Sequence, residues 1–310
     1  MKQTFAGFSQ LEAARAGFVS AWLAQSAGLW TRADTAGAYL DARFGERLEL
    51  AEPEVCRARH QAFGLPGTQP QDYAERLLSL PGQGRLLAGI RFRNLDPDFP
   101  FIELSGDLPL PELLARRTEI FTTLRQTFAV FRPRGLTLCL PAALAVPDAR
   151  TWNLYLSGTP VAAGSWPDCE LLRPARVLDQ QAYLAHYRRW ARLQPVLSTW
   201  VGPEAEADLE AALEADLYFR LDVRGQPVGL IAGRAAAYYD REGVYLIEQL
   251  VFPEYQGRGY GRILQALFQQ AIRTRFDCIW GTIHSENTAS LQTALACGRS
   301  ISEREVFWAF

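Results

Sequence analysis

A glycine-rich run, Gln256-Gly257-Arg258-Gly259-Tyr260-Gly261, separates two segments with different periodicities. Residues 244–252 before it are rich in β-branched and aromatic residues, which predicts a strand. Residues 262–272 after it carry apolar side chains at helical spacing, which predicts a helix. Glycines let the backbone approach a ligand, and the start of a helix offers unpaired N–H groups and the positive end of its dipole. This order predicts a phosphate-binding loop, with Arg258 adding a positive charge.

The spacing of the glycines excludes two common phosphate loops. A P-loop has Lys followed by Ser or Thr after its last glycine, whereas Tyr260 follows Gly259 here. The dinucleotide fingerprint has two residues between its second and third glycines, and this loop has one. The remaining pattern, Gln-x-x-Gly-x-Gly preceded by Val-x-Pro, resembles the acyl-CoA loop of the GNAT N-acetyltransferase superfamily. An ordinary glycine-rich turn is the alternative interpretation of the run taken alone.

The resemblance implies acetyl-CoA as co-substrate and no metal. It implies that the amides of the loop hold the CoA pyrophosphate, and that the preceding strand contacts the pantetheine arm through the backbone of Leu250 and Val251. The loop residues with this implied role are Gln256, Gly257, Arg258, Gly259, Tyr260 and Gly261.

A second segment also resembles the family. Residues 276–283 predict a buried strand, and the following stretch has Asn287 and Gly298 where the family has an Asn and a helix-ending Gly. Asn287 therefore joins the implied cofactor-binding residues. Two positions depart from the family. Many members have at position 294 a Tyr that protonates the leaving thiolate, and this chain has Ala294; Arg299 replaces the usual aromatic residue after the glycine.

The resemblance implies direct attack of an amine on the thioester, which requires a base. Glu248 is the first candidate, and Tyr245 lies six residues before Val251, where several members have their base. Since strand side chains alternate between faces, only one of the two can face the substrate unless a bulge intervenes. The alternative for Glu248 is an ordinary ion pair with an Arg.

His284, at the end of the predicted strand, is a further candidate because its ordinary pKa suits proton transfer near neutrality. A structural hydrogen-bonding role is the alternative for this residue. Tyr255 and Cys297 are conceivable replacements for the missing acid, although neither occupies the family's position.

The fold class predicted is α/β (α+β), with two GNAT-like domains, each a mixed, mostly antiparallel sheet flanked by helices. A chain of 310 residues exceeds one module of about 150 residues. Residues 166–310 are predicted to be the acetyltransferase domain. Its predicted elements, besides those above, are a strand at 171–177, helices at 179–193 and 204–215, strands at 217–223 and 228–234, and a final strand near 305–310.

Residues 1–165 repeat this outline faintly and predict a degenerate GNAT-like domain without a CoA loop. The predicted elements are helices at 11–29, 72–80 and 111–131, and strands at 85–92, 101–104 and 135–140. The segment 105–111 carries two prolines and Asp107 where phosphate would need free amides. A linker is expected at 157–168. An unrelated α/β domain is the alternative for this half.

Composition narrows the partners. A net charge of −2 gives no overall attraction to nucleic acid or anionic membranes. The sequence predicts no signal peptide and no membrane-spanning stretch, and its five cysteines are scattered, so a cytoplasmic protein is expected. A monomer or homodimer is the expected oligomeric state. The function predicted is transfer of an acetyl group from acetyl-CoA to a primary amine of a small molecule or peptide. The alternative is a non-catalytic CoA-binding sensor or assembly protein, which the replacement at Ala294 permits.

Overall fold

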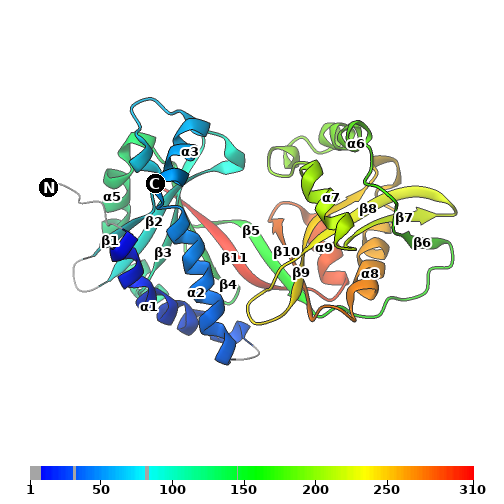
Figure 1. The fold of residues 1–310 in the computed structure, drawn as a ribbon, viewed down its shortest axis with the longest axis horizontal. Helices are drawn as coiled ribbons and strands as arrows, with labels where there is room; N and C mark the ends of the chain where they lie inside the picture. Colours follow the sequence, from blue (N-terminus) through cyan, green and yellow to red (C-terminus); the bar gives the residue numbers. More distant parts are fainter. Residues whose placement is uncertain (1–7, 31–32, 81–83, 145) are drawn as a thin grey trace. The chain divides into compact units, whose positions relative to one another are not determined.

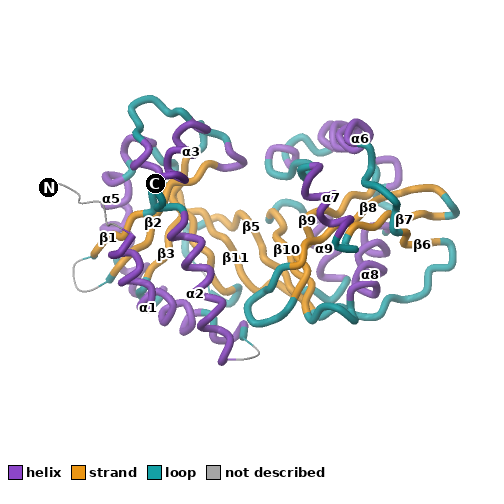
Figure 2. Tube along the Cα trace, in the orientation of Figure 1, coloured by secondary structure: helices purple, strands orange, loops and turns teal. Residues whose placement is uncertain are grey.

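The computed structural model describes residues 8–30, 33–80, 84–144 and 146–310 (Figure 1). The chain divides into two compact units. The first extends to Trp152 and includes Glu303–Phe310, and the second is Asn153–Ser302. Each unit is a mixed sheet flanked by helices, as Figure 2 shows by its colours. No described helix is long and apolar enough to cross a membrane.

The sheet of the second unit has the strand order β5-β10-β9-β8-β7-β6. Only β9 and β10 pair in parallel, and the other neighbours are antiparallel. The strands are β5 (Arg150–Gly158), β6 (Cys169–Leu172), β7 (Tyr218–Val223), β8 (Gln226–Ala235), β9 (Gly243–Val251) and β10 (Cys278–His284). The helices are α6 (Gln180–Leu193), α7 (Glu206–Glu214), α8 (Tyr260–Ile272) and α9 (Thr288–Ala296), with 3₁₀ turns at Leu197–Thr199 and Pro253–Tyr255.

Helices cover both faces of this sheet. Leu264 and Phe268 of α8 pack on one face against Val244 of β9. Tyr183 of α6 and Leu209 of α7 pack on the opposite face with strands β8 and β9. Because both faces are covered, the central strands are apolar along most of their length.

Local sequence signals set several element boundaries. Asp179 caps α6, since its side chain accepts the N–H groups of Gln181 and Ala182. The β7–β8 hairpin turns at Arg224 and Gly225, which both have positive φ, as a two-residue type I′ turn requires. Both features agree with the predicted helix and hairpin.

The sheet of the first unit has the strand order β1-β2-β3-β4-β11, and only β3 and β4 are parallel. The strands are β1 (Arg76–Ser79), β2 (Arg85–Phe92), β3 (Pro100–Gly106), β4 (Gly135–Pro141) and β11 (Ser300–Ala309). The helices are α1 (Phe8–Gln25), α2 (Ala33–Glu49), α3 (Pro53–Phe63), α4 (Leu110–Ala115) and α5 (Arg117–Thr127), with 3₁₀ turns at Ala27–Leu29, Pro70–Tyr73, Arg93–Leu95 and Ala129–Phe131.

The two units repeat one topology. In each, two antiparallel strands lead through helical structure into a parallel strand: β2, β3, α4–α5 and β4 in the first, and β8, β9, α8 and β10 in the second. The repeat predicted from the sequence is therefore present in the fold.

Strands β5 and β11 are exchanged: each pairs with a strand of the unit other than the one that precedes it in the chain. β5 follows β4 in sequence but pairs with β10 over residues 153–158, whereas β11 follows α9 and pairs with β4 over residues 303–309. The units therefore differ from the predicted ranges 1–165 and 166–310. The order of strands along the chain does not predict which unit the last strand joins, because a strand can pair with any sheet edge whose N–H and C=O groups are free.

Several predicted elements differ in detail. The predicted helix at 72–80 is wrong, because residues 76–79 form edge strand β1 against β2. The predicted strand at 171–177 ends at Leu172, and the predicted helix at 111–131 is divided at Arg116. Helices α2 and α3 and strand β5 were not predicted.

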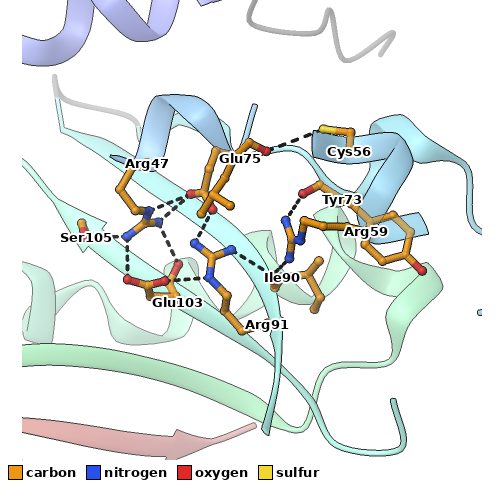
Figure 3. Close-up of polar contacts among 10 residues, drawn as sticks. Arg47, Cys56, Arg59, Tyr73, Glu75, Ile90, Arg91, Glu103 and Ser105 are labelled. Atoms are coloured by element: carbon orange, nitrogen blue, oxygen red, sulfur yellow. Dashed lines mark hydrogen bonds and ion pairs between the residues drawn. The ribbon is translucent and has the colours of Figure 1, made fainter. Parts of the chain in front are cut away.

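The first unit contains a buried network of alternating charges (Figure 3). The side chain of Arg47 binds Glu75 at 2.6 Å and Glu103 at 3.0 Å, and Arg91 binds the same two carboxylates. Burial opposes ionisation of Glu103, but the two guanidinium groups outweigh it and lower the pKa of its carboxyl to about 2. Gly89 admits the network, since a Cβ there would lie 1.9 Å from Glu75. The paired charges indicate a structural role.

The exchange of strands predicts how fragments behave. A fragment of residues 168–310 lacks β5 and retains β11 without β4, so it leaves two sheet edges unpaired and should aggregate. A fragment of residues 153–302 keeps the β5–β10 pairing, and we expect it to be the more soluble of the two. Solubility and thermal unfolding by circular dichroism compare them; equal solubility of both fragments would contradict the prediction.

Candidate functional site

Strands β9 and β10 separate partway along their length. They pair at three positions only, the last being Tyr245 with Trp280. Beyond it, β10 follows β5 as far as His284 and β9 follows β8 as far as Val251. We call residues 246–251 of β9 and 281–284 of β10 the diverging segments. No described strand pairs with residues 246–251 on the side away from β8.

A bulge in β9 lies at the start of its diverging segment. Ala232 pairs with Glu248 and the next residue, Gly233, pairs with Leu246, so Ile247 is the extra residue. Cross-strand partners share a face, which places Tyr245 opposite Arg234 and Glu248 opposite Ala232 on the same side of the sheet. Simple alternation would separate the two side chains, and the bulge brings them onto one face.

The glycine-rich run forms the connection from β9 to α8. Gly257 and Gly259 have φ values of 76° and 80°, in the region that favours glycine, and Gly259 is the N-cap of α8. A Cβ at either position would meet no atom within 4 Å, so both glycines face open space. Arg258 between them is exposed.

The amides of this run are available to a ligand. Among the residues that the structure describes, none accepts a hydrogen bond from the backbone N–H groups of residues 257–261. The first bonds of the helix run from Arg262 and Ile263 to the carbonyl of Gly259. The run therefore presents a series of open N–H donors at the positive end of a helix dipole, which suits an anion.

Two glutamines fix the run against the strand. The Gln256 side chain donates from Nε2 to the carbonyl of Val251 at 3.0 Å. The Gln249 side chain donates to the carbonyl of Gly261 at 2.8 Å. The side chain of Gln256 thus stabilises the backbone of the loop. The groups available to bind an anion are the amides and Arg258.

Glu248 lies buried on the face covered by α6, with 6% of its surface exposed. Its Oε2 accepts hydrogen bonds from the hydroxyls of Tyr183 and of Tyr187, the latter at 2.7 Å. Burial raises the pKa of the carboxyl to about 7, although the two hydroxyls partly oppose this. The partners are tyrosines, so the expected alternative of an ion pair with Arg is wrong. Sequence analysis did not identify Tyr183 and Tyr187, whose spacing of one helical turn on α6 is their one local signal.

His284 ends the diverging segment of β10 and is 8% exposed. Its ring stacks on Trp200, with centroids 5.4 Å apart, and its Nδ1 accepts the N–H of Glu286 at 3.4 Å. Asn287 is the N-cap of α9, and its Oδ1 accepts the N–H of Ser290 at 3.2 Å. The structure therefore gives a local structural role to the side-chain oxygen of Asn287.

The two departures from the family pattern lie close together. Ala294 is fully buried in α9 and packs with Leu156 and Ile283. Arg299 is 4% exposed, and its backbone N–H donates to the carbonyl of Ala294 at 3.0 Å. Tyr255 packs at the edge of the core under α6 and α8, and Cys297 donates its thiol to the carbonyl of Arg262 at 3.5 Å.

The equivalent connection in the first unit differs. Asp107 accepts the N–H of Arg85 at 2.6 Å and pairs with its guanidinium, and Pro109 and Pro111 lack N–H groups at the start of α4. This loop places a carboxylate and prolines where the second unit has open amides, as predicted. Across the described residues, no group of three or more His, Cys, Asp or Glu side chains could hold a metal ion.

Comparison with known families gives one match. The family model described as "Acetyltransferase (GNAT) family" matches residues 183–298, which include the run, both diverging segments and α9. No curated protein sequence matches the chain.

Solved structures similar to this chain include a GCN5-related N-acetyltransferase from Sphaerobacter thermophilus, at 14% identity and a TM-score of 0.50, covering 84% of this chain and 89% of that one. An acetyltransferase of the GNAT family from Colwellia psychrerythraea is 12% identical with a TM-score of 0.48, covering 83% and 96%. A tandem GNAT protein from the clavulanic acid biosynthesis pathway is 13% identical with a TM-score of 0.48, covering 96% and 95%. At 14% identity, the similarity to the Sphaerobacter thermophilus structure supports the fold of this chain and not its activity.

The buried carboxyl of Glu248 predicts a pH-dependent stability. Its pKa is raised in the folded state from 4.5 to about 7, so the folded state loses stability as the pH rises from about 4.5 through 7. Glu248→Gln should remove this loss and gain up to about 3 kcal/mol relative to the natural protein above pH 7, since one pKa unit is worth about 1.4 kcal/mol. Urea unfolding at pH 5 and pH 8 measures it.

The matched control is Glu210→Gln, which removes the same charge from an exposed position on α7. Its effect should not change between the two pH values. If Glu248→Gln changed the free energy of unfolding by the same amount at pH 5 and at pH 8, the raised pKa of Glu248 would be contradicted.

Proposed function

Since residues 183–298 of this chain belong to the GNAT acetyltransferase family, we propose that the protein is an acyl-CoA-dependent N-acetyltransferase. It would transfer an acetyl group from acetyl-CoA to a primary amine of a small molecule or peptide by direct attack. The observation that carries the proposal is the series of open amides at residues 257–261, next to a strand that diverges from its parallel neighbour.

The residues of the run fit a pyrophosphate. Open amides and the dipole of α8 favour negative charge, and Arg258 adds a cation in an exposed position. The absence of side chains at Gly257 and Gly259 leaves the space above these amides free. These features support Gln256 through Gly261 as the pyrophosphate site, in which Gln256 positions the loop.

The diverging segment of β9 fits an extended amide chain such as pantetheine. The N–H of Phe252 donates to Val228 of β8, and hydrogen bonding to one neighbour alternates along an antiparallel strand. By this alternation the backbone groups of Val251 and Gln249 face away from β8, whereas those of Leu250 face it. We therefore propose the N–H of Val251, rather than Leu250, as the main backbone contact, since the carbonyl of Val251 already accepts from Gln256.

Glu248 is the base that the geometry supports best. A pKa near 7 lets the carboxylate accept a proton from the attacking amine at neutral pH, and the hydroxyls of Tyr183 and Tyr187 hold it in place. Tyr245 lies on the same face and can line the path of the amine. His284 is the second candidate for the base, at the far end of the diverging segment of β10.

A non-catalytic CoA-binding sensor is the second candidate function. Its specific support is Ala294, whose buried methyl group replaces the usual acid. Release of CoA thiol, measured with acetyl-CoA and a panel of amines, separates the two functions. Binding of acetyl-CoA without turnover on any amine, and without hydrolysis, would favour the sensor.

Gly259→Val tests the loop. Valine at a φ of 80° is strained and its side chain would fill the space over the amides, so acetyl-CoA should bind at least about tenfold more weakly. Isothermal titration calorimetry measures the dissociation constant. The control is Gly202→Val, an exposed position with no atom within 4 Å of the added Cβ. Undiminished binding in Gly259→Val would overturn the loop assignment.

Glu248→Gln tests the base. The amide cannot accept the amine's proton, so kcat should fall by about 10²–10⁴-fold while the affinity for acetyl-CoA stays unchanged. In the natural enzyme kcat should rise with pH through about 7, as Glu248 ionises, and this rise should be lost in the variant. An unchanged kcat would exclude Glu248 as base and leave His284→Gln as the next variant to measure.

A further inference from the structure

Arg299 is a buried cation that has no carboxylate partner among the described residues. Its side chain donates from Nη2 to the carbonyls of Leu156 at 3.0 Å and Gly281 at 3.2 Å, and no described residue accepts from its buried Nε. It forms no ion pair with any described residue, whereas Arg47 in the first unit has two carboxylates. A buried, unpaired charge is costly, which calls for an explanation beyond packing.

The neighbouring ionisable groups do not neutralise Arg299. Those that interact with it electrostatically are Cys278, Cys297 and Tyr245. Burial raises the pKa of both thiols, so they stay uncharged near pH 7. The charge of the guanidinium is therefore available to act on a ligand.

The guanidinium lies where β9 and β10 begin to diverge. Gly281 is the first residue of β10 after the last β9–β10 pair. A Cβ on Gly281 would lie 3.0 Å from Nη2 of Arg299 and 3.4 Å from Cβ of Leu246. The cation thus lies beside Gly281, at the start of the diverging segment of β10. It is on the face of the sheet that Leu246 shares with α8, opposite to the face of Tyr245 and Glu248.

We propose that Arg299 stabilises the departing CoA thiolate by its positive charge, in a site where position 294 supplies no proton donor. The proposal rests on acetyl-CoA being the substrate. The amine nitrogen forms a bond to the acetyl carbon, the carbon–sulfur bond breaks with its electron pair on sulfur, and the amine proton passes to the base. CoA then leaves as a thiolate whose negative charge is stabilised without a proton.

The buried cation should also lower the pKa of the thiol of bound CoA. An opposite charge within about 4–6 Å lowers the pKa of an acid by about 1–3 units. The thiolate absorbs near 240 nm, so the titration can be followed by absorbance in the CoA complex. Subtracting the spectrum of the complex with desulfo-CoA, which has no thiol, removes the contribution of the protein's own cysteines.

In the natural protein we expect the bound thiol to titrate at least about one unit below free CoA. In Arg299→Gln the titration should return to the value of free CoA, and in Arg299→Lys, which keeps the charge, it should stay lowered. Arg273→Gln, at an exposed position after α8, controls for loss of one positive charge and should leave the titration unchanged. In the same series kcat should fall in Arg299→Gln and be partly restored in Arg299→Lys.

Each result decides one question. Failure of CoA to bind the natural protein would overturn the proposed function. Binding with a thiol that titrates as in free CoA would overturn the role of Arg299 and leave acetyl-CoA binding intact. This measurement needs only the natural protein, so it stands even where Arg299→Gln does not fold. If Arg299 served only to hold the carbonyls of Leu156 and Gly281 in place, the pKa of the bound CoA thiol would not change.

Discussion

The short parallel pairing of β9 with β10 is the constraint on which the site depends. After Tyr245 and Trp280 the two strands follow different antiparallel neighbours, so residues 246–251 of β9 pair with no described strand on the side away from β8. The bulge at Ile247 then sets the direction of Glu248, and Gly281 leaves room for the guanidinium of Arg299. The proposed base, the proposed backbone contacts and the position of the buried cation all depend on this one divergence.

The two units share one topology but differ in the residues of the loop after the second strand and in their buried charges. In the first unit β3 and β4 pair at only two positions, much as β9 and β10 do, but the following loop contains Asp107 and prolines. Its buried charges, such as Arg47 and Glu75, are paired within the network. The second unit instead keeps open amides and an unpaired Arg299. The buried charges of the first unit are paired with each other, which indicates a structural role, whereas Arg299 in the candidate site forms no ion pair with a described residue.

Much of the second unit could be predicted from the sequence because its signals are local. The glycine run, the cap at Asp179 and the alternating strands each act within a few residues. The first unit was harder, since edge strand β1 has a short apolar pattern that a helix shares. The Tyr183–Glu248 contact joins residues far apart in sequence, so no local pattern reported it.

The connection from β9 to α8 could be predicted from the amino-acid sequence, because positive φ at Gly257 and Gly259 favours residues that lack a Cβ. Three features became known from the folded chain: β5 and β11 are exchanged, a bulge places Tyr245 and Glu248 on one face, and Arg299 lies where β9 and β10 diverge, with no carboxylate partner among the described residues. These outcomes depend on which strand edges meet, and strand pairing joins residues at any separation along the chain.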